Sequence, residues 1–441
     1  MKNIDKKFIL FGMSYFLLFC AYTIAQVIKE SIFANTVGVY YINYARLGSI
    51  FILIPFVLFY SYLIDNLEKK HLTIAMFTTY GILQFLCSLF LMHPTIGLSN
   101  TNSNAWRLFG WLFFFLVECF APFMLSVFWA YVNSTSSPEQ AKKRYSTIIT
   151  FGTLGGLISS ALSWFFFSGQ THAMHTAHMH TLISASSSFL IIGSAYIIYY
   201  LNKTMPDKLL ASYAERIGEN QAEKPQKESI FSGAKLTITT PYIFGIFSIV
   251  FFYEVTSMII TFLKLYAVQY RSTNISQASA LLFQVTTMTQ LVAFLFSLFG
   301  TRNLMRKLGE RSCLLLIPIL ITISFLYMVL AKFSFISIII GFMLIRALNY
   351  SFIRPIKEAL YIPTDIQTRY KAKSWIDTIG TKLAKGTGSA CNIALASLTG
   401  SGLLLGFSAL FSIIAFGWIV VSVFLGNRYR DIIRNKEIVG N

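Results

Sequence analysis

Charged residues are scarce in this chain of 441 residues. Asp, Glu, Lys and Arg together make up 12% of the sequence, whereas a typical soluble domain contains about 25%. Hydrophobic residues make up 55%, and the mean hydropathy is +0.62. Because so little of the chain is polar enough to face water, a soluble globular protein is excluded. The composition predicts an integral membrane protein.

Acidic residues are especially few, with 18 Asp and Glu against 36 Lys and Arg, which gives a formal net charge of +18. A basic excess can indicate nucleic-acid binding. Here the basic residues are dispersed through short polar segments, and no soluble domain remains to carry a basic face. We therefore expect no nucleic-acid partner and attribute the excess to the positive-inside rule of membrane proteins.

Catalytic sets and cysteine frameworks are also missing. The sequence contains no GxxxxGK[ST] phosphate-binding loop, and no nucleophile, base and orienting acid form a recognisable set outside the apolar stretches. We expect no enzyme activity and no cofactor. The cysteines lie in or beside apolar segments without metal-like spacing, which argues against a disulfide framework: Cys20, Cys87, Cys119, Cys313 and Cys391.

Long apolar stretches recur along the chain, each close to the roughly 20 residues that a membrane helix needs. About twelve spans are predicted, at 8–33, 44–63, 72–92, 104–133, 146–168, 181–201, 237–265, 276–300, 310–331, 333–354, 374–399 and 402–426. A bilayer offers the backbone no hydrogen-bond partners, so the spans should be helices. The predicted fold is all-α, with an N-terminal six-helix bundle (1–201), a polar linker (202–236) and a C-terminal six-helix bundle (237–441).

The distribution of basic residues predicts the orientation. Basic clusters occupy alternate polar segments, including the N-terminus, the linker and the C-terminus, so these segments should all be cytoplasmic. The loops on the opposite side contain few basic residues, namely Arg107, Lys264, Arg271 and Lys332.

A weak internal repeat supports the division into two bundles. The segments SVFWAYVNSTSSPEQAKKRYSTIITFGTLGG and SFIRPIKEALYIPTDIQTRYKAKSWIDTIGTKLAKGTG share one order: helix, polar turn with proline, basic residues, glycine-bearing helix. Parallel repeats of this kind relate the two halves of major-facilitator transporters, which hold cargo near the midplane. The glycines of the two helices are expected to allow close helix packing.

Nine charged residues lie inside the apolar stretches, where an ionisable side chain suggests a functional site. They are Lys29, Glu30, Arg46, Glu118, Glu254, Arg346, Asp377, Lys382 and Lys385. Asp377 and Lys385 share a helical face with Thr381, because they are spaced by four residues. For Asp377 and Arg346, a structural ion pair is at least as good an explanation as contact with cargo.

The buried lysines favour an anionic cargo. Lys29, Lys382 and Lys385 exceed what neighbouring acids can neutralise, and lysine serves phosphate as a point charge. Glu118 and Glu254 lie in apolar surroundings, where they would carry a coupling proton, pair with the lysines or accept a hydrogen bond from cargo.

Several of these segments resemble one known family. IKEALYIPTDIQTRYKAKSWIDTIGTKLAKGTGSA is similar to the signature of the ATP/ADP translocases, the nucleotide transporters of intracellular bacteria and plastids. VECFAPFMLSVFWAYVNSTSSPEQAKKRY, FYEVTS and IKES resemble further segments of that family. The chain departs from the family at Ser257 and Met258, where members have Trp and Lys.

The resemblance implies a twelve-helix major-facilitator-like carrier in a bacterial inner membrane, which exchanges or imports nucleotides by alternating access. It matches Lys29, Glu118, Glu254 and the lysines Lys382 and Lys385 to the charged positions of the family. The departures leave a dinucleotide cofactor or another phosphate-bearing anion open as cargo. The sequence favours a monomer without fixing the oligomeric state.

Two further residue groups yield hypotheses. Cytoplasmic acidic and basic residues are predicted to form ion pairs that break when an inner gate opens: Glu139, Lys142, Lys143, Arg144, Lys357, Glu358, Asp365 and Lys373. Alternatively, the basic ones only orient the chain. The histidines of THAMHTAHMH, His172, His175, His178 and His180, alternate with methionines, so a soft-metal site in a membrane protein without nucleotide flux is a second functional hypothesis.

Overall fold

The computed structural model describes residues 2–136, 138–168, 173–206, 210, 230–299, 301–365, 371–373, 375–396, 398, 401–435 and 437–439. Within these ranges the chain is helical apart from loops and one isolated β-bridge, between Thr364 and Val439. Nine helices in the described part are long and apolar enough to cross a membrane, and Phe335–Leu348 is a shorter apolar helix. The predicted all-α membrane fold is confirmed.

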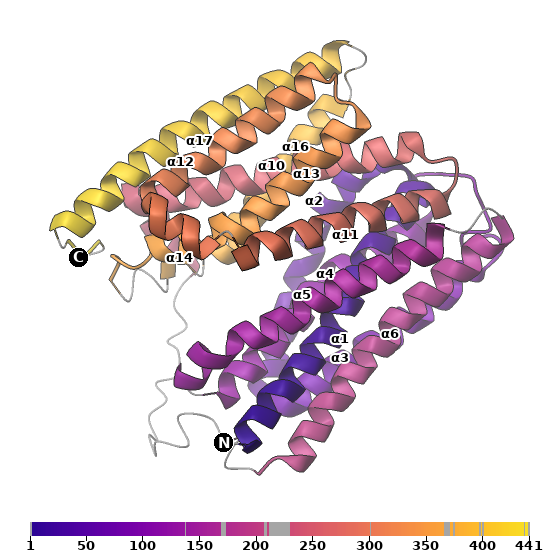
Figure 1. The fold of residues 1–441 in the computed structure, drawn as a ribbon. Coiled ribbons are helices and arrows are strands. Elements are labelled where there is room, and N and C mark those ends of the chain that lie inside the picture. The colour runs from indigo at the N-terminus through magenta and orange to yellow at the C-terminus, as the bar shows by residue number, and fades with distance from the viewer. Residues whose placement is uncertain are drawn as a thin grey trace. The chain divides into compact units, whose positions relative to one another are not determined.

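Contacts divide the chain into two units, which are Met1–Lys224 with Val268–Thr287, and Pro225–Ala267 with Met288–Asn441. The N-terminal helices of the first unit are α1 (Lys2–Phe33), α2 (Ile42–Asn66), α3 (Lys69–Leu89), α4 (Leu108–Thr135), α5 (Pro138–Ser168) and α6 (Ala173–Thr204). Helix α1 packs against α5, α6 and α4, and α3 packs against α6 and α4 (Figure 1).

A sharp break separates the first two helices. Helix α1 ends in a π-helical turn, Ala34–Gly38, which is followed by a 3-10 turn, Val39–Tyr41. Gly38 has φ 120°, a backbone conformation that glycine adopts without the steric penalty of a side chain. The apolar run from Asp5 to Phe56 is therefore divided into two helices at this glycine.

An aromatic core fixes the N-terminal half of α1 against α4. Phe8, Phe11 and Tyr15 are buried at spacings of three and four, so they share one face of α1. The rings of Tyr15 and Phe128 stack with centroids 4.9 Å apart, and Phe11 meets Tyr131 edge to face at 5.8 Å. Aromatic pairs of this geometry add to the stabilisation from burial.

Helix α5 approaches α1 closely at a glycine, as the sequence predicted for this helix. A Cβ atom on Gly155 would lie 2.6 Å from the Phe16 carbonyl oxygen and 3.1 Å from the Cys20 sulfur. The Cys20 thiol donates to the Gly155 carbonyl oxygen at 3.2 Å. The absence of a side chain therefore allows the two backbones to meet.

This close approach predicts a loss of stability in the Gly155→Ala variant. The added methyl group would collide with backbone, and overpacking of this kind costs about 1 to 3 kcal/mol. The measurement is the fraction of monodisperse protein that remains after heating in detergent. Gly402→Ala is the control, because its nearest neighbour would lie 3.9 Å away. Equal melting of both variants would contradict the prediction.

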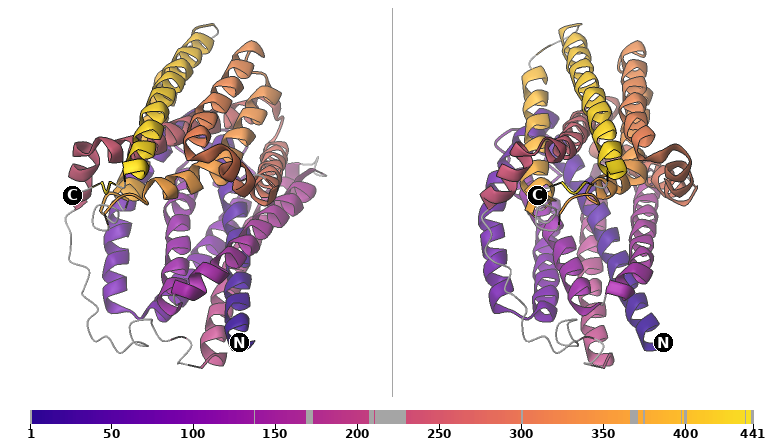
Figure 2. Two further views of the ribbon diagram at one scale, coloured as in Figure 1. Left: turned by 60° about the vertical axis from the view of Figure 1, so that its left-hand side comes forward. Right: turned by 90° about the vertical axis from the view of Figure 1, so that its left-hand side faces the viewer.

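The second unit contains a different set of helices. Its elements include α9 (Ile230–Thr239), most of α10 (Pro241–Arg271), the end of α11 (Ile275–Phe299), α12 (Thr301–Leu330), α13 (Phe335–Leu348), a π turn (Asn349–Ile353), α14 (Arg354–Leu360), a second π turn (Ile376–Gly380), α16 (Thr381–Ala396) and α17 (Ser401–Asn435). Helix α17 runs alongside α12 (Figures 1 and 2). Phe325 and Phe411 stack at this contact, with centroids 3.8 Å apart.

Helices of the described part overlap the predicted spans, but several boundaries differ and the count of twelve spans remains a prediction. Helix α5 begins at Pro138 rather than at 146, so the basic residues at 142–144 lie in its first turns. The structure groups Val268–Thr287 with the first unit, whereas the sequence predicts a single boundary between the two bundles, in the linker. Most of the predicted linker lies outside the described residues, and the division into two six-helix bundles remains a prediction.

Candidate functional site

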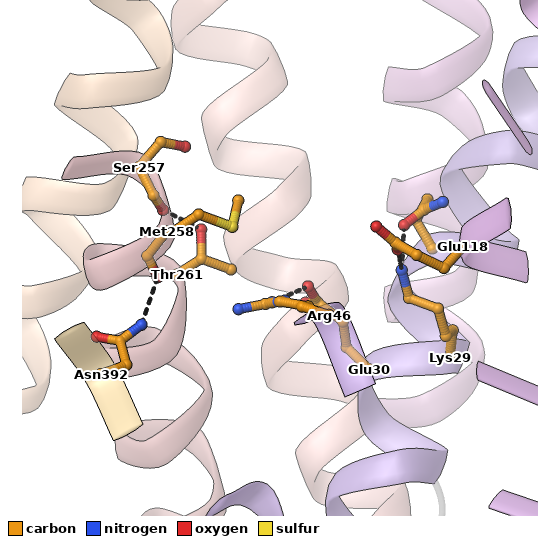
Figure 3. A network of polar contacts seen from close by, with 9 residues as sticks. Lys29, Glu30, Arg46, Glu118, Ser257, Met258, Thr261 and Asn392 are labelled. Carbon is orange, nitrogen blue, oxygen red and sulfur yellow. Dashed lines mark hydrogen bonds and ion pairs between the residues drawn. The ribbon is translucent and has the colours of Figure 1, made fainter. Parts of the chain in front are cut away.

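Lys29 lies in the last turns of α1 and is buried, with 3% of its side chain exposed. Its ammonium group donates to the Gln26 side-chain oxygen at 2.5 Å and forms an ion pair with Glu118 of α4 (Figure 3). It also lies 4.9 Å from the centre of the Phe114 ring. A buried charge requires such partners, because an uncompensated ion within a protein is strongly destabilising.

Helical spacing explains how these partners meet. Gln26 precedes Lys29 by three residues, and Phe114 precedes Glu118 by four, so each pair lies on one face of its helix. The next residue of α1, Glu30, pairs with Arg46 of α2 at 3.2 Å (Figure 3). The first unit therefore joins α1 to two neighbouring helices through two ion pairs in membrane-spanning segments.

The second unit has a looser lysine–carboxylate contact. The Lys385 ammonium group of α16 lies 3.9 Å from the Glu254 carboxylate of α10, and 43% of the Lys385 side chain is exposed. Asp377 lies in the π turn before α16 and pairs with Lys357 at 2.7 Å. Asp377 and Lys385, which the sequence placed on one helical face, thus bind partners on different segments.

Two cations of the second unit approach one aromatic ring. Lys264 of α10 lies 4.6 Å from the centre of the Phe342 ring, and the Arg346 guanidinium lies 5.5 Å from it. The prediction that Lys264 belongs to an outer loop is wrong, because α10 continues to Arg271 and Lys264 is only 5% exposed. The apolar residues on both sides of Lys264, FL and LYAV, were the signal for a longer helix. Lys382, the remaining predicted lysine, lies partly exposed on α16.

Some residues of the predicted gate network form ion pairs, and their role as a gate remains a prediction. Lys373 pairs with Glu358 at 2.5 Å, beside the Lys357 pair described above. Arg144 pairs with Asp5 of α1, an acid outside the predicted network. The Asp365 backbone N–H donates to the Val439 carbonyl at 3.0 Å. The side chains of Glu139, Lys142 and Lys143 lie outside the described residues.

A buried tyrosine accompanies this network. The Tyr361 ring lies 5.7 Å from the Lys373 ammonium group. Burial raises the pKa of the Tyr361 phenol, and the nearby carboxylates of Asp377 and Glu358 raise it further. The phenol therefore stays protonated, and the negative charges here are those of the carboxylates.

The histidine-rich segment does not form a metal site in the part of it that the structure describes. His180 is buried, with Nδ1 2.7 Å from the Thr176 carbonyl and Nε2 2.7 Å from the Ser279 hydroxyl. Both of its nitrogens are thus in hydrogen-bond contact, while His178 is exposed. His172 and the side chain of His175 lie outside the described residues. Among the residues that the structure describes, no group of three His, Cys, Asp or Glu side chains could hold a metal ion.

The two positions that depart from the family signature lie at a tight helix contact. Ser257 is 1% exposed, and the Met258 carbonyl accepts a hydrogen bond from Asn392 at 3.2 Å (Figure 3). A Cβ atom on Gly388 of α16 would lie 2.7 Å from the Met258 Cβ atom. Packing between α10 and α16 occupies this region.

Solved transporters share the fold. The xylose transporter XylE from E. coli has a TM-score of 0.63 at 13% identity, covering 96% of this chain and 95% of XylE. The nucleoside transporter NupG has a TM-score of 0.62 at 14% identity, covering 96% of this chain and 99% of NupG. At these identities the likeness concerns the fold alone, which is that of a major-facilitator-like transporter.

Sequence comparison gives the family. The model of the TLC ATP/ADP transporter family matches residues 2–429, so the chain belongs to this family. ADP,ATP carrier protein 3 of Rickettsia typhi is 21% identical over 412 residues, 82% of this chain and 81% of that protein. The chloroplastic ADP,ATP carrier protein 2 of Arabidopsis thaliana is 22% identical in an alignment of 485 positions, which covers 98% of this chain and 76% of that protein. The resemblance drawn from the sequence is confirmed.

Proposed function

We propose that this protein carries nucleotides such as ATP and ADP across a bacterial inner membrane, by exchange or import through alternating access, with its termini on the cytoplasmic side. Membership of the ATP/ADP transporter family supports this cargo, as do the carriers of Rickettsia and chloroplasts. Transporters with this fold change access around a site near the midplane.

The observation that carries the proposal is the buried Lys29–Glu118 pair. Lys29 carries a buried ammonium group in the last turns of a membrane-spanning helix, at a position that matches a charged position of the family. Glu118 retains partial exposure, so a phosphate group approaching from that side would compete with it for Lys29. Lys385, with its long contact to Glu254, is a second ammonium group that phosphate oxygens can approach.

Reconstituted protein tests this function. Proteoliposomes loaded with ADP are expected to take up labelled ATP faster than empty proteoliposomes, because exchange needs a counter-substrate. Unlabelled nucleotides, dinucleotide cofactors and inorganic phosphate compounds should then be ranked as competitors. Uptake that does not respond to internal ADP, with no competition from any nucleotide, would refute nucleotide carriage and favour another anion or the metal-binding hypothesis.

A further inference from the structure

One face of α1 remains partly exposed in the C-terminal half of the helix. Between Leu18 and Ser31, the positions that keep partial exposure are Phe19, Tyr22, Gln26 and Glu30, and every other residue is buried. They are spaced by three, four and four residues, so they form a single stripe along the helix.

Polar partners occupy one end of this stripe. Gln26 holds the Lys29 ammonium group, and Glu30 is paired with Arg46. Charged groups at membrane depth face the interior of a bundle or a water-filled cavity. Phe19 and Tyr22 continue the same stripe, so their rings lie on the side of α1 that carries Gln26 and Glu30.

Helices α4 and α5 extend the aromatic part of this stripe. The Trp129 ring of α4 lies 5.4 Å from Tyr15 and 5.3 Å from Tyr145 of α5. Phe19 lies 5.7 Å from Tyr15 and 5.6 Å from Tyr22. The five rings thus form a continuous row, called here the aromatic row: Tyr22, Phe19, Tyr15, Trp129 and Tyr145.

Helices α1 and α4 each carry one residue of the buried ion pair and at least one ring of the aromatic row. Trp129 follows Glu118 by eleven residues, about three helical turns, so the two lie on one face of α4. On α1, seven residues separate Tyr22 from Lys29, a rise of about 10 Å. A cation and a set of flat rings therefore lie along one side of α1 within the first unit.

We infer that the partly exposed rings of the aromatic row, above all Phe19, Tyr22 and Trp129, stack against the base of the nucleotide while Lys29 binds its phosphates, and that the buried Tyr15 supports these rings from the core. A nucleotide has a flat aromatic base at one end and an anionic group at the other, which matches the order along α1. Aromatic side chains stack with every base. This inference rests on the proposed function and adds the residues that recognise the base.

The test separates base recognition from phosphate recognition by using two competitors. Exchange of labelled ATP is measured in proteoliposomes of the wild type, Tyr22→Leu and Trp129→Leu, with unlabelled ATP or inorganic tripolyphosphate as competitor. Loss of one stacking ring should weaken competition by ATP about 10-fold, while competition by tripolyphosphate, which has no base, stays unchanged. The ratio of ATP to CTP as competitors should also fall in both variants.

Matched variants control for folding. Tyr22→Phe and Trp129→Phe keep a ring and should restore competition by ATP. Tyr196→Leu removes a ring from an exposed position on α6 and should have no effect, and rates are expressed per amount of monodisperse protein. Equal weakening of both competitors, or no change in either competition or the ATP to CTP ratio, would overturn the inference even if wild-type exchange is intact. Absence of exchange in the wild type would instead refute the proposed function itself.

Discussion

Replacement of Lys29 by alanine is expected to reduce ATP/ADP exchange at least about 100-fold, which corresponds to about 2.7 kcal/mol. The buried ammonium group would be lost as a phosphate partner, and the Glu118 carboxylate would remain without the cation that it contacts. An anionic side chain at the site would then repel an anionic cargo. The measurement is the initial rate of labelled ATP uptake into ADP-loaded proteoliposomes.

The control for this prediction is Lys332→Ala. Lys332 is an exposed lysine in the loop between α12 and α13, so its removal changes the net charge equally without touching the buried pair. If Lys29→Ala exchanges ATP and ADP as fast as Lys332→Ala, the Lys29 ammonium group has no role in the proposed mechanism. Breaking a buried ion pair costs about 3 to 5 kcal/mol of stability. The amount of folded protein is therefore measured separately for each variant, and exchange is expressed per folded molecule.

A second variant at the same pair distinguishes the roles of the carboxylate. Glu118→Gln keeps the shape and can still accept a hydrogen bond from Lys29, but it cannot bind or release a proton. If Glu118 only holds Lys29, ATP/ADP exchange should persist in this variant at a reduced rate. If Glu118 carries a coupling proton, accumulation driven by a pH gradient should disappear while exchange at uniform pH remains.

The membrane fold could be predicted from the sequence because each span must satisfy the same two conditions, apolar side chains and internal backbone hydrogen bonds. The charged residues Lys29 and Glu118 could be selected for the same reason, since they interrupt apolar runs. Their pairing could not be predicted. The two residues are 89 positions apart, and which faces of α1 and α4 meet depends on the packing of the Phe11, Tyr15 and Phe128 rings.

The distribution of basic residues predicted the loops less accurately where a helix extends beyond its most apolar segment. Lys264 looked like a loop residue because it lies near the end of the hydrophobic window, yet α10 continues past it to Arg271. The aromatic row was also missed, since aromatic residues are common throughout the chain at 16%. Only the exposure pattern of α1 separates Phe19 and Tyr22 from rings that are simply buried in the core.

Lys7 provides the second prediction with a large effect, and here the effect is on stability. Its side chain is 1% exposed, and its ammonium group donates to the Thr135 carbonyl at 2.6 Å. Thr135 is the last residue of α4, where carbonyl groups lack helical partners and a cation is favourable. Lys7→Met should therefore destabilise the protein by about 1.5 to 3 kcal/mol, the range for a hydrogen bond to a charged group.

The measurement for Lys7→Met is thermal unfolding in detergent, followed by exchange assays on the protein that remains folded. Exposed Lys6 is the matched control, because Lys6→Met removes the same charge from the adjacent residue and should melt like the wild type. Exchange per folded molecule should be normal in both variants, since Lys7 binds a helix end rather than cargo. If Lys7→Met melts like the wild type, the α4 terminus does not need this cation and the stability prediction fails. If exchange is lost as well in that case, Lys7 belongs with the cargo-binding lysines.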